Sequence, residues 1–152
     1  MKAPHFSLSD QNGKTHSSEE YAGKWLVVYF YPKDDTPGCT VESCSFRDSY
    51  ESLLKNNIHI IGISRDSTKS HAKFATKFEL PFPLLSDPDH STIEAFGAWG
   101  EKKFMGKVYD GILRKTYIID PSGEIVKTYD TVKPAGHADE VYADIQSLQN
   151  SS

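Results

Sequence analysis

Two cysteines, Cys39 and Cys44, are the residues in this sequence whose type and spacing could do chemistry. A cysteine acts as a nucleophile or a metal ligand through its thiolate form. Thr36 is a favoured N-cap and Pro37 a favoured first helical residue, so a helix is expected to begin at Pro37. Cys39 would then lie in the first turn, where unpaired backbone N–H groups and the positive end of the helix dipole favour a thiolate.

The helix terminus alone is too weak to produce a mostly ionised thiol. An ordinary cysteine is only about 3% thiolate at neutral pH, and a mostly ionised one needs roughly 3.4 kcal/mol of differential stabilisation. A helix terminus supplies typically about 0.3–1 kcal/mol, and up to about 2. The carboxylates of Asp34, Asp35 and Glu42 would oppose ionisation if they pointed at the sulfur. We therefore expect an arginine or lysine from elsewhere in the chain to face Cys39.

The spacing of the two cysteines predicts a conformational change. Five steps along an ideal helix separate Cα atoms by roughly 8–9 Å and rotate them about 140° apart. A disulfide needs Cα atoms within about 7 Å of each other. If both cysteines lie on one helix, a bond between them requires local unwinding, so we expect a folded reduced state and a partly unwound oxidised state.

Composition excludes several classes of protein. The 152 residues carry a net charge of -4, which argues against nucleic acid as a partner because phosphate binding needs clustered lysines and arginines. The longest apolar run, residues 25–31, is far shorter than the roughly 20 residues that span a membrane. The N-terminus shows no apolar signal region, which favours the cytoplasm. Reducing compartments suppress structural disulfides, so the cysteines are expected to be reactive or metal-binding. The 6 histidines show no ligand spacing, and no zinc site is expected.

The first half of the chain predicts a strand, a helix and a strand. Residues 25–31 and 58–64 are continuous apolar runs, as in strands that are covered on both faces. Between them an apolar stripe recurs with helical spacing and ends at Asn56 and Asn57. The members of the stripe are Phe46, Tyr50, Leu53 and Leu54. This order predicts a right-handed parallel crossover.

The second half continues with a helix, a hairpin and a helix. A helix is expected after Ser67, and residues 115–120 and 124–129 form a hairpin around residues 121–123. The last helix has one apolar face, made by Ala138, Val141, Ile145 and Leu148. The whole order predicts a single domain over residues 1–152, with an α/β fold in which helices flank a mixed central sheet. A thioredoxin-like fold has this order.

The segment around Cys39 resembles a known family. Pro32, Thr36 and Cys39 are spaced as a proline, three residues, a threonine, two residues and a cysteine. In this pattern the chain resembles the peroxiredoxins, and residues 30–40 resemble the branch called bacterioferritin comigratory protein or PrxQ. The resolving cysteine of that branch matches Cys44. Three further segments, at residues 3–6, 99–103 and 111–116, extend the resemblance over almost the whole chain.

The resemblance implies a role for each of five residues. Cys39 would be the peroxidatic nucleophile that becomes a sulfenic acid, and Cys44 the resolving thiol that condenses with it to a disulfide. Arg114 would be the active-site arginine, which supplies the required cation. Thr36 would hydrogen-bond the sulfur and the peroxide, and Pro32 would shield the thiolate from water.

The resemblance also implies an activity. The chain would be a thioredoxin-dependent peroxiredoxin, an antioxidant peroxidase that reduces hydrogen peroxide and organic hydroperoxides. Thioredoxin or a similar dithiol donor would reduce the disulfide, with no metal, haem or flavin. A monomer suffices because both cysteines can react within one chain. The family's usual Arg-Ser-Thr-Phe here reads Arg114-Lys115-Thr116-Tyr117, which keeps the arginine. The sequence does not place residues 101–113.

Two other functions fit parts of the sequence. A protein dithiol–disulfide oxidoreductase would use the same fold class, but its usual Cys-x-x-Cys spacing is absent. A non-catalytic binding or chaperone-like domain would carry incidental thiols and would be unaffected by Cys39→Ser. Glu42 is interpreted as a solvated helix residue, and Thr36 can be read as an N-cap alone.

Overall fold

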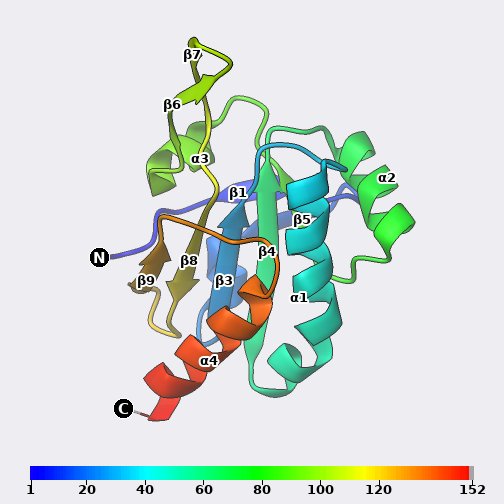
Figure 1. Ribbon diagram of the computed structural model, residues 1–152. Coiled ribbons are helices and arrows are strands. Elements are labelled where there is room, and N and C mark those ends of the chain that lie inside the picture. Colours follow the sequence, from blue (N-terminus) through cyan, green and yellow to red (C-terminus); the bar gives the residue numbers. More distant parts are fainter. Residues whose placement is uncertain (151–152) are drawn as a thin grey trace.

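The computed structural model describes residues 1–150 and builds them around one seven-stranded sheet (Figure 1). The strand order is β2-β1-β5-β4-β3-β8-β9. The strands are β1 (Ser7–Ser9), β2 (Thr15–Ser17), β3 (Trp25–Phe30), β4 (Ile58–Ser64), β5 (Leu84–Ser86), β8 (Lys115–Ile119) and β9 (Ile125–Tyr129). Residues 151 and 152, the end of the domain expected over 1–152, lie outside the described residues.

Strands β3 and β4 form the buried centre of the sheet. They pair in parallel from Trp25 opposite Ile58 to Phe30 opposite Ile63, and β8 pairs with β3 antiparallel. Nearly every side chain of both strands is buried, as their apolar runs predict. Parallel and antiparallel pairs thus occur in one sheet flanked by helices, and the predicted α/β, thioredoxin-like class is confirmed.

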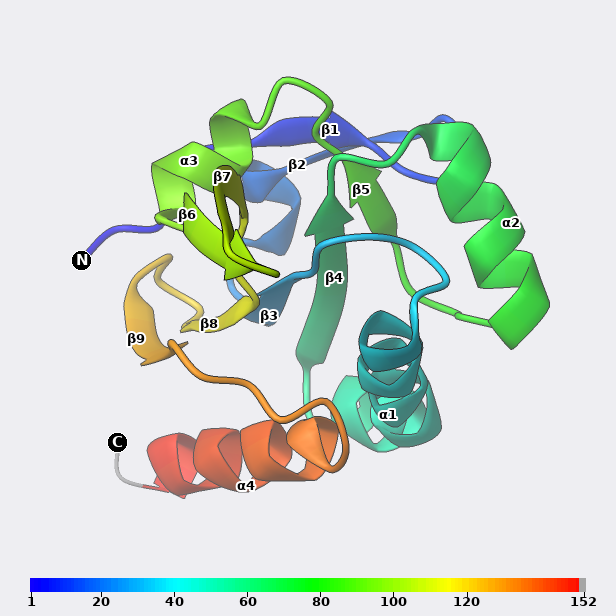
Figure 2. The ribbon, with the colours of Figure 1, turned by 45° about the horizontal axis from the view of Figure 1, so that its top comes forward.

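Helices cover both faces of the sheet (Figure 2). On one face, helix side chains pack against Val27 and Tyr29 of β3; the helices there are α1 (Pro37–Lys55), α2 (Thr68–Phe78) and α4 (His137–Asn150). On the other face, α3 (Ser91–Phe96) and the N-terminal segment with Phe6 pack against Leu26, Val28 and Phe30. The alternation of β3 side chains between two cores explains why this strand is apolar at successive positions.

Several elements escape sequence analysis because they are short or polar. Strand β5, helix α3 and the 3-10 turn η1 (Ser18–Tyr21) span only 3, 6 and 4 residues. A hairpin of β6 (Trp99–Phe104) and β7 (Lys107–Ile112) forms a separate two-stranded sheet that stands out from the body (Figure 1). This hairpin accounts for most of residues 101–113, which the sequence did not place.

One glycine in β4 allows the packing beneath α1. Gly62 lies opposite Tyr29, and a Cβ built on Gly62 would come 2.7 Å from Tyr29 Cζ. The Tyr29 ring is held between Phe46 and Tyr31, at centroid distances of 4.9 and 5.4 Å. Its hydroxyl hydrogen-bonds Ser43 Oγ of α1 at 2.9 Å. The ring therefore cannot move aside without disturbing α1.

We predict that Gly62→Ala lowers the free energy of unfolding by about 1–3 kcal/mol, the usual cost of overpacking a core. The added methyl group would displace Tyr29 and strain its bond to Ser43. Urea denaturation of the parent and the variant measures the difference. A loss below about 0.5 kcal/mol would show that the Tyr29 ring has room that the packing does not indicate.

Candidate active site

Cys39 lies where the sequence places it, in the first turn of α1 beyond the carboxyl end of β3. The helix begins at Pro37 with Thr36 as N-cap, so Cys39 is its third residue. Cys39 is fully buried in the core on the inner side of α1, whereas Cys44 is half-buried. Both thiols are unpaired and lie on one continuous helix. The condition for the predicted unwinding is therefore present: ideal helix geometry keeps these Cα atoms roughly 8–9 Å apart.

Arg114 is the cation that faces the sulfur. It lies between β7 and β8, and its Nη2 donates to Cys39 Sγ at 3.1 Å. Gly38 makes room for this approach, because a Cβ on Gly38 would come 3.3 Å from the same nitrogen. The sulfur therefore lies beside a positive charge and in the first turn of a helix, two features of the surroundings of reactive cysteines. The structure thus brings together Cys39 and Arg114 from positions 75 residues apart.

Glu42 is a member of the site that sequence analysis missed. The interpretation as a solvated residue is wrong: Glu42 is 0% exposed and accepts a hydrogen bond from Arg114 Nη1 at 2.6 Å. Burial raises the pKa of Glu42 to about 7, and the Arg114 guanidinium acts in the opposite direction. Oε2 of Glu42 has no hydrogen-bond partner among the described residues. The sequence spacing could have indicated this position: Glu42 lies three residues after Cys39, and residues at positions i and i+3 share one face of a helix.

The acidic residues near Cys39 in sequence are each paired with a basic side chain. Asp34 Oδ2 lies 2.7 Å from His71 Nδ1, and Asp35 Oδ2 accepts from Lys77 Nζ at 2.8 Å. Glu42 is paired with Arg114, as described above. These carboxylates are the ones expected to oppose ionisation of Cys39. Each of them thus has a basic side chain within hydrogen-bond distance, and among these partners it is Arg114 that also contacts the sulfur.

Thr36 and Pro32 lie in the loop that leads into α1. The hydroxyl of Thr36 donates to the carbonyl oxygen of Lys33 at 2.9 Å, and its side chain makes no cap hydrogen bond. A hydroxyl carries one proton, so within the described residues the expected bond to the Cys39 sulfur is replaced by this backbone bond. Pro32 is half-buried directly after the buried Tyr31.

Lys102 is a second cation that sequence analysis did not single out. Most side chains described in residues 101–110 of the projecting hairpin are exposed, but Lys102 is half-buried. Its stem passes 3.2 Å from where a Cβ of Gly111 would stand, and its Nζ donates to the Ile112 carbonyl at 2.9 Å. Burial and the nearby Arg114 lower the pKa of Lys102, and Cys39 raises it. The hairpin therefore contributes a positive charge to the surroundings of Cys39.

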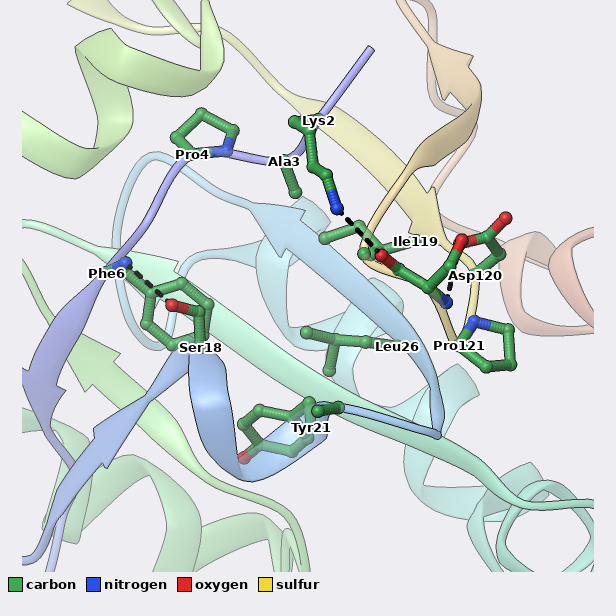
Figure 3. A pocket seen from close by; sticks show the side chains of 13 residues that line it. Lys2, Ala3, Pro4, Phe6, Ser18, Tyr21, Leu26, Ile119, Asp120 and Pro121 are labelled. Carbon is green, nitrogen blue, oxygen red and sulfur yellow. Dashed lines mark hydrogen bonds between the residues drawn. The ribbon is translucent and has the colours of Figure 1, made fainter.

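A pocket at the other end of the sheet lies away from these residues (Figure 3). It has a volume of about 190 Å³, and the residues that line it include Phe6, Leu26 and Ile119. Leu26 is near the start of β3, whereas Cys39 follows the end of β3. Lys2 also lines the pocket, and its Nζ donates to the carbonyl oxygen of Ser122 at 3.2 Å. This pocket does not belong to the cysteine site.

Comparison with known proteins identifies the family of this chain. A model of the AhpC/TSA family matches residues 1–128. Peroxiredoxin Bcp of Bacillus subtilis is 46% identical over 152 residues, which cover 100% of this chain and 95% of that protein. The chain belongs to the peroxiredoxins, in the Bcp and PrxQ branch.

Further relatives support the same placement of this peroxiredoxin. Peroxiredoxin Bcp of Escherichia coli is 48% identical over 139 residues, covering 91% of this chain and 89% of the relative. The solved structure of Xanthomonas campestris Peroxiredoxin Q has a TM-score of 0.89 and 43% identity, and covers 93% of this chain and 90% of that chain. This peroxiredoxin is therefore a thiol-dependent peroxidase. Within residues 1–150, no helix is long and apolar enough to cross a membrane.

We predict a pH-dependent difference in stability between the parent and Glu42→Gln. The pKa of Glu42 is about 7 in the folded protein, and its ordinary value is 4.5. Between these two pH values the folded state therefore binds more protons than the unfolded state. The unfolding free energy of the parent therefore falls relative to the variant as the pH rises through this window, by up to a few kcal/mol.

Urea denaturation of both proteins at about pH 5 and about pH 8 measures this difference. Glu51→Gln is the matched control, because Glu51 is an exposed residue of the same helix. An equal effect of Glu42→Gln at both pH values would show that the buried carboxyl keeps an ordinary affinity for protons.

Proposed function

We propose that this protein reduces hydroperoxides with Cys39 as the peroxidatic nucleophile and Cys44 as the resolving thiol. The observation that carries the proposal is the 3.1 Å contact between Arg114 Nη2 and the sulfur of Cys39 in the first turn of α1. A guanidinium at this place both favours a thiolate and offers donors to a second anion. The substrates are hydrogen peroxide and organic hydroperoxides.

The first step oxidises the sulfur of Cys39. The thiolate attacks one oxygen of the peroxide, so that an S–O bond forms and the O–O bond breaks. The other oxygen leaves with the electron pair and takes a proton to become an alcohol, or water when the substrate is hydrogen peroxide. Arg114 stabilises the charge that moves from sulfur to oxygen, because its donors are already placed before the reaction. Cys39 is left as a sulfenic acid.

The second step joins the two cysteines. The Cys44 thiolate attacks the sulfenic sulfur of Cys39, a disulfide forms, and hydroxide leaves as water after taking a proton. Because both residues lie on α1, this step requires the helix to unwind between them. Unwinding breaks the contacts of Arg114 with Cys39 and Glu42, and it exposes the buried Cys39 sulfur.

The third step returns the enzyme to its reduced form. Thioredoxin or a similar dithiol supplies two electrons and two protons by thiol–disulfide exchange. The cycle is complete within one chain, so the protein acts as a monomeric single domain, in the reducing cytoplasm. A related Xanthomonas campestris bacterioferritin comigratory protein is described for its alkyl peroxide reduction activity, which supports organic hydroperoxides as substrates.

We predict that Cys39→Ser abolishes peroxide consumption, and that Cys44→Ser keeps one fast oxidation of Cys39 but forms no intramolecular disulfide. Stopped-flow tryptophan fluorescence and a thiol count after mixing with hydrogen peroxide measure the two steps. Insulin reduction without peroxide is run beside them. An unreacted Cys39 in the parent, together with insulin reduction, would replace the peroxidase with a dithiol oxidoreductase.

We also predict that Arg114→Met lowers the second-order rate constant for Cys39 oxidation by about 10²–10³-fold, the typical effect of losing one preorganised donor group. The rate constant of Arg114→Lys should lie between those of the parent and Arg114→Met, because an ammonium keeps the charge but not the planar fork that reaches both Cys39 and Glu42. Lys55→Met, at the exposed end of α1, is the control for lost charge. Equal rates for Arg114→Met and the control would remove Arg114 from the reaction.

A further inference from the structure

A buried polar cluster lies beside the peroxidatic segment and takes no part in the steps above. Its centre is Asp34, which is 7% exposed and lies in the loop between β3 and α1. Oδ2 of Asp34 accepts from Ser70 Oγ at 2.8 Å and lies 2.7 Å from His71 Nδ1. Oδ1 accepts from the hydroxyl of Tyr31 at 2.6 Å. Both oxygens of this carboxylate are therefore hydrogen-bonded.

His71, in α2, is 0% exposed and has an acceptor at each ring nitrogen. Nε2 lies 3.1 Å from the carbonyl oxygen of Leu85, which can only accept, so Nε2 carries a proton. Nδ1 and Asp34 Oδ2 face each other at 2.7 Å, and separating these two buried residues would leave a polar group unpaired.

Asp34 and His71, together with Asp66 just after β4, have the grouping of a metal site within the described residues. Their oxygens are already occupied by protein donors, since Asp66 Oδ2 accepts from Ser64 Oγ and from the amide of Asp34, both at 2.8 Å. The cluster is thus a closed hydrogen-bonded network, and its effect is mechanical: it fastens the loop before α1 to α2 and β4.

Helix α2 also holds the chain on the other side of the reactive segment. Arg47, three residues after Cys44 on α1, donates from Nη1 to the carbonyl oxygen of Phe78 at 2.9 Å. Phe78 is the last residue of α2. Figure 2 shows the loop from β3 reaching toward α2 before it turns into α1. One helix therefore contacts the chain before Cys39 and after Cys44.

We infer that Asp34 and His71 are positioning residues that fix the N-terminal end of the segment that unwinds, while Arg47 marks its C-terminal end. This inference rests on the proposed two-cysteine cycle. Unwinding between Asp34 and Arg47 breaks the contacts of Cys39, Glu42 and Ser43, but it leaves the buried Asp34–His71 pair in place. The pair therefore holds the reduced site against Arg114.

The inference predicts opposite changes in two reactions when the N-terminal end is loosened. Oxidation of Cys39 needs the folded site, so it slows as the unwound population grows. Disulfide formation needs the unwound state, so it should be at least as fast in the loosened protein as in the parent. A sulfenic acid then spends less time in the folded site, where a second peroxide would convert it to a sulfinic acid.

Asp34→Asn tests this prediction, with Asp110→Asn on the exposed hairpin as the matched control. The expected result is a rate constant for Cys39 oxidation lower by about tenfold, with a sulfinic yield per turnover lower by about threefold or more. Amide exchange in the reduced protein should rise at residues 36–46 and stay unchanged in β3, β4 and α4. Mass spectrometry measures both the sulfinic yield and the exchange.

A uniform rise of exchange over the whole chain, or an unchanged sulfinic yield with slower oxidation, would overturn the inference and leave a purely structural role. Ser70→Ala, which removes one hydrogen bond to Asp34, serves if Asp34→Asn does not fold, and should give smaller changes in the same directions. The exchange arm does not need peroxide. Failure of the parent to oxidise Cys39 would therefore count against the proposed function alone.

Discussion

The contact between the Arg114 guanidinium and the sulfur of Cys39 is the interaction on which the rest of the structure depends. A helix terminus supplies typically about 0.3–1 kcal/mol to a nearby anion, and a desolvated cation supplies the larger part. Such a cation needs its own compensation when it is taken out of water. Glu42 provides it at the second nitrogen of the fork, while the nearby Asp34 and Asp35 bond to other side chains, His71 and Lys77.

The cysteine site meets two requirements that oppose each other. The reduced enzyme needs Cys39 buried and held against Arg114, whereas the disulfide needs the same turns of α1 to separate from the core. Different parts of α1 meet these two requirements. Its first turns are held largely by hydrogen bonds of Cys39, Glu42 and Ser43, which can be exchanged for bonds to water. Farther along, beyond Arg47, Leu53 buries apolar surface that has no such replacement, so the rest of α1 stays in place.

The parts of this arrangement that depend on local patterns could be predicted from the sequence. Apolar runs located β3 and β4, and Thr36-Pro37 located the start of α1 and therefore the environment of Cys39. The need for a cation followed from magnitudes, and the family resemblance pointed to Arg114. Pairing between distant residues could not be predicted, because Glu42 and Arg114 lie 72 residues apart and Asp34 and His71 lie 37 apart. Without a known partner, a carboxylate is expected to be exposed, because acidic residues are rarely buried unless they are paired.

Charge balance in the site follows from this distant pairing. Arg114 is shared between the Cys39 sulfur and Glu42, whose pKa of about 7 leaves it partly protonated near neutral pH. When Glu42 holds its proton, the full charge of Arg114 acts on the sulfur; when it loses the proton, the Glu42 carboxylate competes with the sulfur for that charge. Lys102 then supplies the remaining positive charge, held on the Ile112 carbonyl two residues before Arg114. The projecting hairpin thereby contributes to the site: its half-buried Lys102 adds positive charge to a group of residues that otherwise comes from α1 and from the chain before β8.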